Sequence, residues 1–161
     1  MGRECRRVPR WWQHPRDETG DLIPLLSGSF SIESKTWKEH YEKWQQGLRH
    51  EDDKWIPIEE KNKCSYDEWH GPAPKEEDYM PDWREEEKTH YQMYEDTSEG
   101  TPISPVMATP EELARWLVDN NASAFADQTA SYEGWLRVCQ GDWACCAVIS
   151  RGKMTPGVDM P

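Results

Sequence analysis

Long apolar runs are missing from this chain of 161 residues. No stretch approaches the roughly 20 apolar residues that span a bilayer, and the basic start MGRECRRVPRWWQHP contains no apolar signal-peptide segment. Leu, Ile, Val and Phe are scarce, and the mean hydropathy is −1.03. We therefore expect a protein of the cytoplasm that does not bind membranes, whose five cysteines are free thiols in a reducing compartment.

The common linear motifs of catalysis are also missing. The sequence contains no P-loop, no GxGxxG, no GxSxG, no HExxH and no CxxC. This excludes the standard forms of nucleotide-binding proteins, serine hydrolases, zinc proteases and dithiol redox proteins. An enzyme whose site has no linear signature stays open.

Aromatic residues take the place of the missing aliphatic ones. The chain has 10 Trp and 6 Tyr, and each large aromatic side chain can bury about 150–250 Å². A few of them can form the core of a domain that has little Leu or Ile. We expect a single α+β domain with several short helices, a small antiparallel sheet and long ordered loops.

The negative charge is concentrated in the middle of the sequence. The formal net charge is −12, and residues 51–100 carry 17 acidic and 6 basic side chains, whereas residues 1–50 carry 7 and 9. Such a segment repels nucleic acid and anionic lipid. It favours a protein partner with a basic face, or a mimic of the phosphate backbone of DNA, with no direct contact with nucleic acid or membrane. Solubility alone also explains it.

Three segments organise the expected fold. Residues 1–33 form an extended N-terminal segment, residues 49–108 an acidic, aromatic-rich segment, and residues 109–161 a helix–helix–hairpin unit. Between the first two, the spacing of Trp37, Tyr41, Trp44 and Leu48 predicts a helix over 34–48 capped by Ser34. Residues 49–82 are expected to be an ordered loop. Residues 83–94 are expected to form a further helix, because residues 84–93 contain no Gly or Pro.

The C-terminal segment has the clearest local signals. Thr109-Pro110-Glu111-Glu112 predicts the start of a helix, and this helix is expected to end near Asn120. A second helix is predicted from about Thr129, with a core face listed as Tyr132, Trp135, Leu136 and Cys139. The small apolar run 144–150 predicts a strand. Residues 154–158 are expected to pair with it as the second strand of a hairpin. We expect the two helices to form an antiparallel pair that covers one face of the 144–150 strand.

Two constellations could carry chemistry. Cys5, His14, Cys64 and His70 are the ligand types of tetrahedral zinc, but their spacing matches no common zinc finger; free thiols and surface imidazoles are the alternative. On a helix, Glu86 and His90 would be neighbours, forming either an acid–base pair or a surface ion pair.

A third candidate is a binding surface on the acidic, aromatic-rich segment. Aromatic rings supply binding energy, and flanking charges supply orientation and association rate. The candidate partner-binding residues are Tyr79, Trp83, Glu86, Glu87, Tyr91, Tyr94, Glu95, Asp96 and Glu99. The competing interpretation is that these rings line the domain's own core while the acids face water.

Several motifs resemble a known family. The segments CRRVPRWWQHPR, EDYMPDW, THYQMYEDTSEGTPISP, TPEELARWL, ASAFADQTASYEGWLRVC and GKMTPGV are similar to those of small proteins encoded by tailed bacteriophages and prophages. The resemblance covers nearly the whole chain except residues around 33–62. Cys145 and Cys146 stand where the family pattern has proline and serine, so the resemblance implies that these thiols are not essential.

The resemblance implies no known activity, cofactor or catalytic residues. Small accessory phage proteins often act by binding host machinery, so it implies a non-enzymatic protein in the cytoplasm of a bacterial host. The partner classes are a defence factor or a nucleic-acid-processing factor, which an acidic chain could inhibit. The alternative from another class is an enzyme with a non-standard, metal-assisted site.

Overall fold

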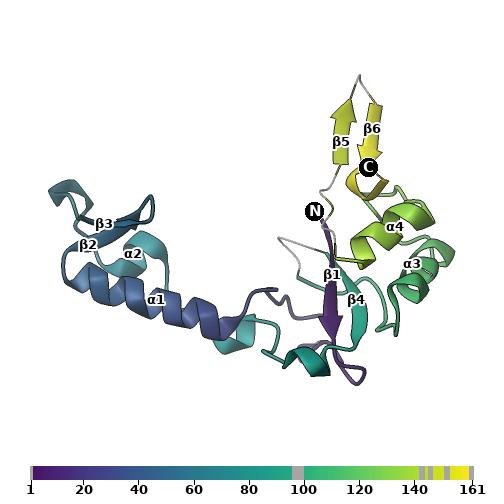
Figure 1. Ribbon diagram of the computed structural model, residues 1–161, viewed down its shortest axis with the longest axis horizontal. Coiled ribbons are helices and arrows are strands. Elements are labelled where there is room, and N and C mark those ends of the chain that lie inside the picture. Colours follow the sequence, from purple (N-terminus) through teal and green to yellow (C-terminus); the bar gives the residue numbers. More distant parts are fainter. Residues whose placement is uncertain (1, 96–99, 142–143, 145–146, 151–152, 160–161) are drawn as a thin grey trace. The chain divides into compact units, whose positions relative to one another are not determined.

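The computed structural model describes residues 2–95, 100–141, 144, 147–150 and 153–159. Within them the fold is α+β, as the sequence predicts (Figure 1). The strands described form three separate two-stranded antiparallel pairs instead of one small sheet. The chain, which the sequence analysis treated as one domain, is arranged as two compact units: unit 1 is residues 1–26 and 83–161, and unit 2 is residues 27–82.

The central sheet of unit 1 pairs two strands that are far apart in the sequence. Strand β1 (Arg3–Val8) pairs antiparallel with β4 (His90–Glu95), with Arg3 opposite Glu95. The predicted helix over residues 83–94 is therefore wrong, because only the short 3-10 turn η3 (Glu85–Glu87) precedes the strand. A segment free of Gly and Pro can form either element, and pairing with β1 selects the strand.

The two faces of this sheet have different neighbours. On β4, Tyr91 packs against the helical core and Met93 is part of it, whereas Tyr94 lies on the opposite face under the Arg6 guanidinium, 4.2 Å from its ring centroid. A helix would have placed Tyr91 and Tyr94 on one face, as predicted. A strand alternates its side chains, so the two rings point to opposite sides.

Two helices cover the Met93 face of the sheet. Helix α3 (Pro110–Asp119) contacts β4, and α4 (Tyr132–Cys139) contacts β1. The predicted start of α3 is confirmed: the Thr109 hydroxyl accepts from the Glu112 N–H at 3.1 Å. Helix α4 begins later than predicted, because Ser131 and not a residue near Thr129 provides its cap.

The core between α3, α4 and the sheet confirms the predicted helix faces. Trp135 and Cys139 are fully buried, and the partly buried Trp116 and Leu136 pack against the same cluster. The other buried members of this cluster are Met93, Leu113, Ala114, Leu117, Ala124, Val138, Ala144 and Val158. The expectation that the helices cover the 144–150 strand is wrong in its partner. They cover the β1–β4 sheet instead. Ala144, from the predicted strand, lies in the core beside them.

The C-terminal hairpin forms as the sequence predicts. Strand β5 (Ala147–Ser150) pairs antiparallel with β6 (Lys153–Pro156). The 3-10 turn η4 (Gly157–Asp159) follows, and it returns to α4: the Asp159 carboxylate accepts from the N–H of Ser131 at 2.9 Å. Cys145 and Cys146 lie outside the described residues.

Unit 2 contains more regular structure than predicted. Helix α1 (Phe30–Gln45) starts four residues before the expected position, because Ser29 and not Ser34 caps it. Where an irregular loop was expected over 49–82, the hairpin β2 (Leu48–Glu51) and β3 (Lys54–Pro57) is followed by helix α2 (Tyr66–His70). The 3-10 turns η1 (Glu60–Asn62) and η2 (Glu76–Asp78) complete the unit.

Both missed elements have local causes. Asp52 and Asp53 adopt positive φ angles of 47° and 59°, the conformation that a tight two-residue hairpin turn requires. Helix α2 has a complete capping box, in which Ser65 and Glu68 satisfy each other's backbone N–H groups. Acidic residues at the surface thus also determine the local backbone conformation of unit 2.

Candidate functional site

The acidic, aromatic-rich segment is divided between the two compact units. Tyr79 belongs to unit 2, where it is half-buried with its ring 5.9 Å from Phe30. Trp83 belongs to unit 1 and packs edge-on against Trp12 at 4.7 Å and Trp11 at 6.3 Å. The predicted set of binding residues is therefore distributed over two compact units.

The acids of this segment in unit 1 are matched by cations. Arg84 pairs with Glu86 at 3.1 Å and with Glu87 at 3.3 Å. Glu95 pairs with Arg3 at 3.3 Å. Glu85 receives both Arg7 and Lys88. These ion pairs leave little net charge along the stretch, which weakens it as a surface for a basic partner. The candidates Asp96 and Glu99 lie outside the described residues.

The proposed acid–base pair does not form. His90 begins strand β4, and its Nδ1 lies 2.8 Å from the Thr89 hydroxyl, while Glu86 pairs with Arg84. The helical spacing on which the pair depended is absent because the segment is not a helix. Among the described residues no three His, Cys, Asp or Glu side chains gather as a metal site would require.

Three of the four candidate zinc ligands have other protein neighbours, and Cys64 is a free, exposed thiol. Both ring nitrogens of His14 lie within hydrogen-bond distance of protein oxygens, and His70 stacks on Tyr66 at 5.2 Å. Cys5 packs against the core cluster that contains Cys139, and its influence, together with burial, raises the pKa of the Cys139 thiol. A zinc site needs thiolates and free imidazole nitrogens, so these surroundings do not favour one.

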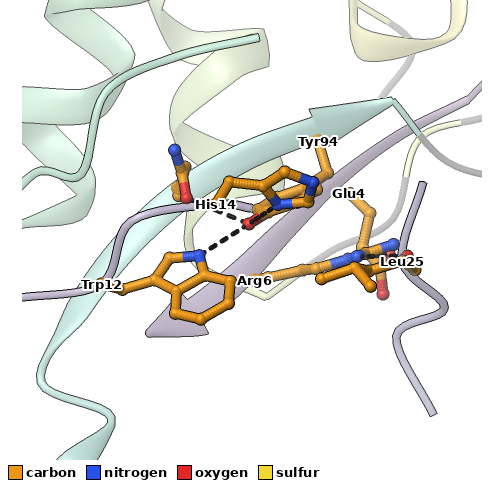
Figure 2. Close-up of polar contacts among 7 residues, drawn as sticks. Glu4, Arg6, Trp12, His14, Leu25 and Tyr94 are labelled. Carbon is orange, nitrogen blue, oxygen red and sulfur yellow. Dashed lines mark hydrogen bonds and ion pairs between the residues drawn. The ribbon is translucent and has the colours of Figure 1, made fainter. Parts of the chain in front are cut away.

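A polar cluster around the Tyr94 hydroxyl is the best-organised group in unit 1. Figure 2 shows the Trp12 indole and His14 imidazole converging on this hydroxyl. Trp12 Nε1 donates to it at 3.0 Å, it lies 3.0 Å from Gln92 Oε1, and His14 Nδ1 lies 3.2 Å away. Burial raises the pKa of Tyr94 to about 12, although the Trp12 hydrogen bond and the Arg6 cation favour the ionised form. The phenol is therefore neutral at ordinary pH.

A cleft of about 900 Å³ opens beside this cluster. Trp12, His14 and Gln92 of the cluster line it together with Arg16, Ser104 and Trp116. Among the described residues that line the cleft, Arg16 alone has a permanent charge and none is a carboxylate. In a chain with a net charge of −12, such a lining favours an anion over a cation.

An irregular backbone segment forms one wall of the cleft. Tyr91 bridges to Met107 and Tyr94 to Pro102, so a longer stretch of chain runs opposite a shorter piece of β4. Between the bridges, the Ser104 hydroxyl takes the place of a backbone acceptor and receives the Met93 N–H at 2.9 Å. This bulge-like arrangement turns the prolines of the segment toward the cleft without leaving β4 unpaired.

The second candidate surface is the aromatic cluster of unit 2. It is made of five rings from α1 and α2: Trp37, Tyr41, Trp44, Tyr66 and Trp69. Trp44 and Tyr66 are buried, and the indole N–H groups of Trp37 and Trp44 donate to the carbonyls of Gly71 at 3.2 Å and Cys64 at 3.0 Å. The buried rings act as the core of a small unit that has few aliphatic residues.

Part of this aromatic cluster faces solvent. Tyr41 is 39% exposed and Trp69 is 45% exposed. Their neighbours in sequence, Glu42 and Asp67, are exposed as well. Unit 2 as a whole carries 14 acidic and 8 basic side chains, a net charge of −6. Exposed rings on an acidic unit are the combination that was predicted for the candidate partner-binding residues between Tyr79 and Glu99.

Sequence reasoning could have found part of this surface. The spacing of Trp37, Tyr41 and Trp44 predicts that these rings share one face of a helix, but it does not show which of them face solvent. Only the contact with α2 decides which rings are covered, and α2 was missed although Ser65 and Glu68 form a capping box. The cleft had no signal in the sequence, because its residues come from segments that meet only in the fold.

Comparison of the chain with protein-family models, with curated proteins and with solved structures gives no match. No helix in the described part of the chain is both long enough and apolar enough to cross a membrane. The function is therefore argued from the two surfaces themselves.

Proposed function

We propose that this chain is a non-enzymatic phage accessory protein that binds a protein with a basic face in the cytoplasm of a bacterial host and modulates it. The observation that supports this proposal is the aromatic cluster of unit 2, with Tyr41 and Trp69 exposed on a unit of net charge −6. Tyr and Trp are the residues that most often dominate binding energy at protein interfaces.

The chemistry of the partner follows from the surface. The exposed rings require an apolar or planar group to pack against, and Arg and Lys side chains can also stack on aromatic rings. The surrounding acids accelerate association with a basic surface and repel nucleic acid. A basic protein segment that contains aliphatic or arginine side chains satisfies both requirements.

The test is affinity capture from a bacterial lysate with the full chain as bait, followed by binding of the purified, identified partner. We expect capture to decline as salt is raised, because exposed charges are screened over about 8 Å at physiological ionic strength. Trp69→Ala and Tyr41→Ala should each weaken binding of the purified partner about tenfold or more, as loss of an interface anchor does. Trp11→Ala is the matched control, since Trp11 is 67% exposed but lies in unit 1.

Two results would count against the proposal. If the purified partner binds Trp69→Ala and Tyr41→Ala as well as the parent while Trp11→Ala loses it, the contact surface is in unit 1. If no protein is captured specifically at low salt, the binding function itself is refuted. The indole N–H signals of Trp37 and Trp44 in NMR spectra show whether unit 2 remains folded in each variant.

A further inference from the structure

The cleft of unit 1 is a second site, independent of the protein-binding surface proposed above. Its lining combines the Arg16 guanidinium with the indoles of Trp12 and Trp116. Arg16 uses one nitrogen to donate to the Gly20 carbonyl at 2.7 Å, which fixes the side chain beside the cleft while its other N–H groups remain donors. A cleft lined by a cation and by aromatic residues is suited to an anionic group carried on a planar ring.

The local electrostatics around His14 also favour an anion. Burial lowers the pKa of His14 most, the hydrogen bond to the Ile23 carbonyl opposes this, and the cations Arg6 and Arg16 lower it further. Arg6 is itself paired with Glu4 at 3.0 Å and donates to the Leu25 carbonyl, yet its charge still acts on the imidazole. The imidazole therefore lies in a positive local field within an acidic chain.

The hydrogen-bond network beneath the cleft has one proton too few when His14 is neutral. His14 Nε2 lies 2.6 Å from the Ile23 carbonyl, which can only accept, so the ring proton is on Nε2. Nδ1 is then an acceptor facing the Tyr94 hydroxyl. That hydroxyl has a single hydrogen, and Gln92 Oε1 at 3.0 Å competes for it.

The orientation of the Gln92 amide is fixed, so the network cannot rearrange to supply the proton. Gln92 Nε2 donates to the Ser104 carbonyl at 2.8 Å, which leaves only Oε1 to face Tyr94. A second proton on His14 resolves the conflict. Nδ1–H then donates to the Tyr94 oxygen, Tyr94 donates to Gln92, and Trp12 continues to donate to Tyr94 (Figure 2).

Hydrogen bonding therefore favours the charged imidazole, whereas burial and the two arginines oppose it. An anion in the cleft changes this balance, because it offsets the charges of Arg6 and Arg16 close to the ring. We propose that the cleft binds a small ligand in which an anionic group is attached to a planar ring, and that binding is coupled to the uptake of one proton by His14. The anion pairs with Arg16, and the ring lies against the indoles.

The test compares three probes with the full chain: naphthalene-2-sulfonate, its neutral isostere naphthalene-2-sulfonamide, and inorganic sulfate. The sulfonate keeps its charge through the range in which histidine titrates, so any pH dependence belongs to the protein. Calorimetry in two buffers of different ionisation enthalpy measures the protons taken up. NMR signals of Trp12 Nε1–H and the His14 ring report the location of binding.

We expect the sulfonate to bind about tenfold or more tightly than either the sulfonamide or sulfate, the ratio that one charge-assisted hydrogen bond supplies. Its affinity should increase several-fold between about pH 7.5 and about pH 6, with proton uptake, because histidine titrates in this range. Arg16→Gln should weaken sulfonate binding about tenfold. Arg10→Gln, an exposed arginine outside the cleft lining, is the matched control and should have no effect.

His14→Asn separates the two parts of the proposal. It should remove the pH dependence and the proton uptake while leaving discrimination between sulfonate and sulfonamide through Arg16. Equal binding of sulfonate and sulfonamide, or sulfonate binding that Arg16→Gln leaves unchanged, would overturn the anion site. Binding without proton uptake in the parent chain would overturn the coupling to His14. Absence of binding by all three probes would overturn the site as a whole.

Discussion

The Val158 carbonyl oxygen lies 2.6 Å from the position that a Cβ atom at Gly134 would occupy. Gly134 is on α4, and the turn η4 that contains Val158 packs directly against it. Asp159 in the same turn accepts from the Ser131 hydroxyl at 2.6 Å, just before the helix. A glycine inside α4 thus allows the C-terminal turn to close over the helix start.

Gly134→Ala should destabilise unit 1 even though alanine is the better helix former. The intrinsic gain of about 1 kcal/mol is exceeded by overpacking against backbone, which costs typically about 1–3 kcal/mol in addition to the lost Asp159 contact. Thermal melting followed by circular dichroism measures the difference. Gly28→Ala is the control, since its nearest neighbour, a Tyr79 ring carbon, would be at 3.7 Å. Equal melting of Gly134→Ala and the parent would show that η4 is not docked on α4.

Trp135→Ala should cost about 3–5 kcal/mol of unfolding free energy, the usual loss for a large buried aromatic. Trp135 is fully buried among the residues of α3, α4 and β4. Its indole Nε1 is buried without a hydrogen-bond partner among the described atoms. Trp135→Phe removes this unpaired donor and should therefore cost clearly less than Trp135→Ala.

Chemical denaturation of the two Trp135 variants provides the comparison. If Trp135→Phe is as damaging as Trp135→Ala, the indole nitrogen has a partner that matters. If Trp135→Ala unfolds like the parent, Trp135 is not a core residue. The exposed Trp11 supplies the control, since Trp11→Ala should change the unfolding free energy little.

Tyr94→Phe should destabilise unit 1 by about 1–3 kcal/mol, because it leaves buried polar partners without a hydrogen bond. Trp12 Nε1 loses its acceptor and Gln92 Oε1 its donor. The matched control is Tyr41→Phe, in which the same hydroxyl is removed from an exposed ring of unit 2. Ultraviolet titration supplies a second readout: the parent should contain one tyrosine that ionises at about pH 12, and Tyr94→Phe should lack it.

Acidification should destabilise the folded chain through His14. Its pKa is below the ordinary value of 6.5 in the folded state, mainly because of burial and also because of Arg6 and Arg16. Below pH 6.5 the unfolded chain therefore binds a proton that the folded chain has not yet bound. The unfolding free energy is unaffected above this pH and declines as the pH falls from 6.5 toward the folded-state pKa.

Denaturation at a series of pH values with the parent and His14→Asn isolates this contribution. The decline below pH 6.5 should be smaller in the variant. His40 in unit 2, whose pKa is also lowered, chiefly by burial and then by His50, remains in both chains and accounts for a shared part of the decline. An identical pH dependence in the two chains, or an NMR titration of His14 at or above 6.5, would contradict the prediction.

How well the sequence predicted each part of the fold depends on how local its cause is. The start of α3 follows from Thr109 and Pro110, and the β5–β6 hairpin follows from a short apolar run and its return. Each of these needs only a few adjacent residues, and each is confirmed. Helix α1 was found from its aromatic spacing, but its start was misplaced because Ser29 and Ser34 are both competent caps.

The elements that failed depend on distant partners. The segment that contains β4 has no Gly or Pro, and local propensity did not separate strand from helix until β1 was placed beside it. That pairing places Tyr91 and Tyr94 on opposite faces of the sheet. Tyr94, one of the proposed binding residues, is therefore the buried centre of a hydrogen-bond network. Acids near the proposed surface are paired with cations for the same reason, since Arg7 on β1 reaches Glu85 only in the folded chain.

The amino-acid sequence by itself determined the α+β class, the large share of aromatic residues, the negative charge and the packed faces of α3 and α4. These follow from composition and from periodicity within one element. Only the tertiary structure decided which aromatic rings face solvent, which acids are matched by cations, and that Trp12, His14 and Tyr94 converge beside a cleft with Arg16. Burial and ion pairing are properties of residues far apart in the chain, and their free energy is realised only when those residues are brought into contact.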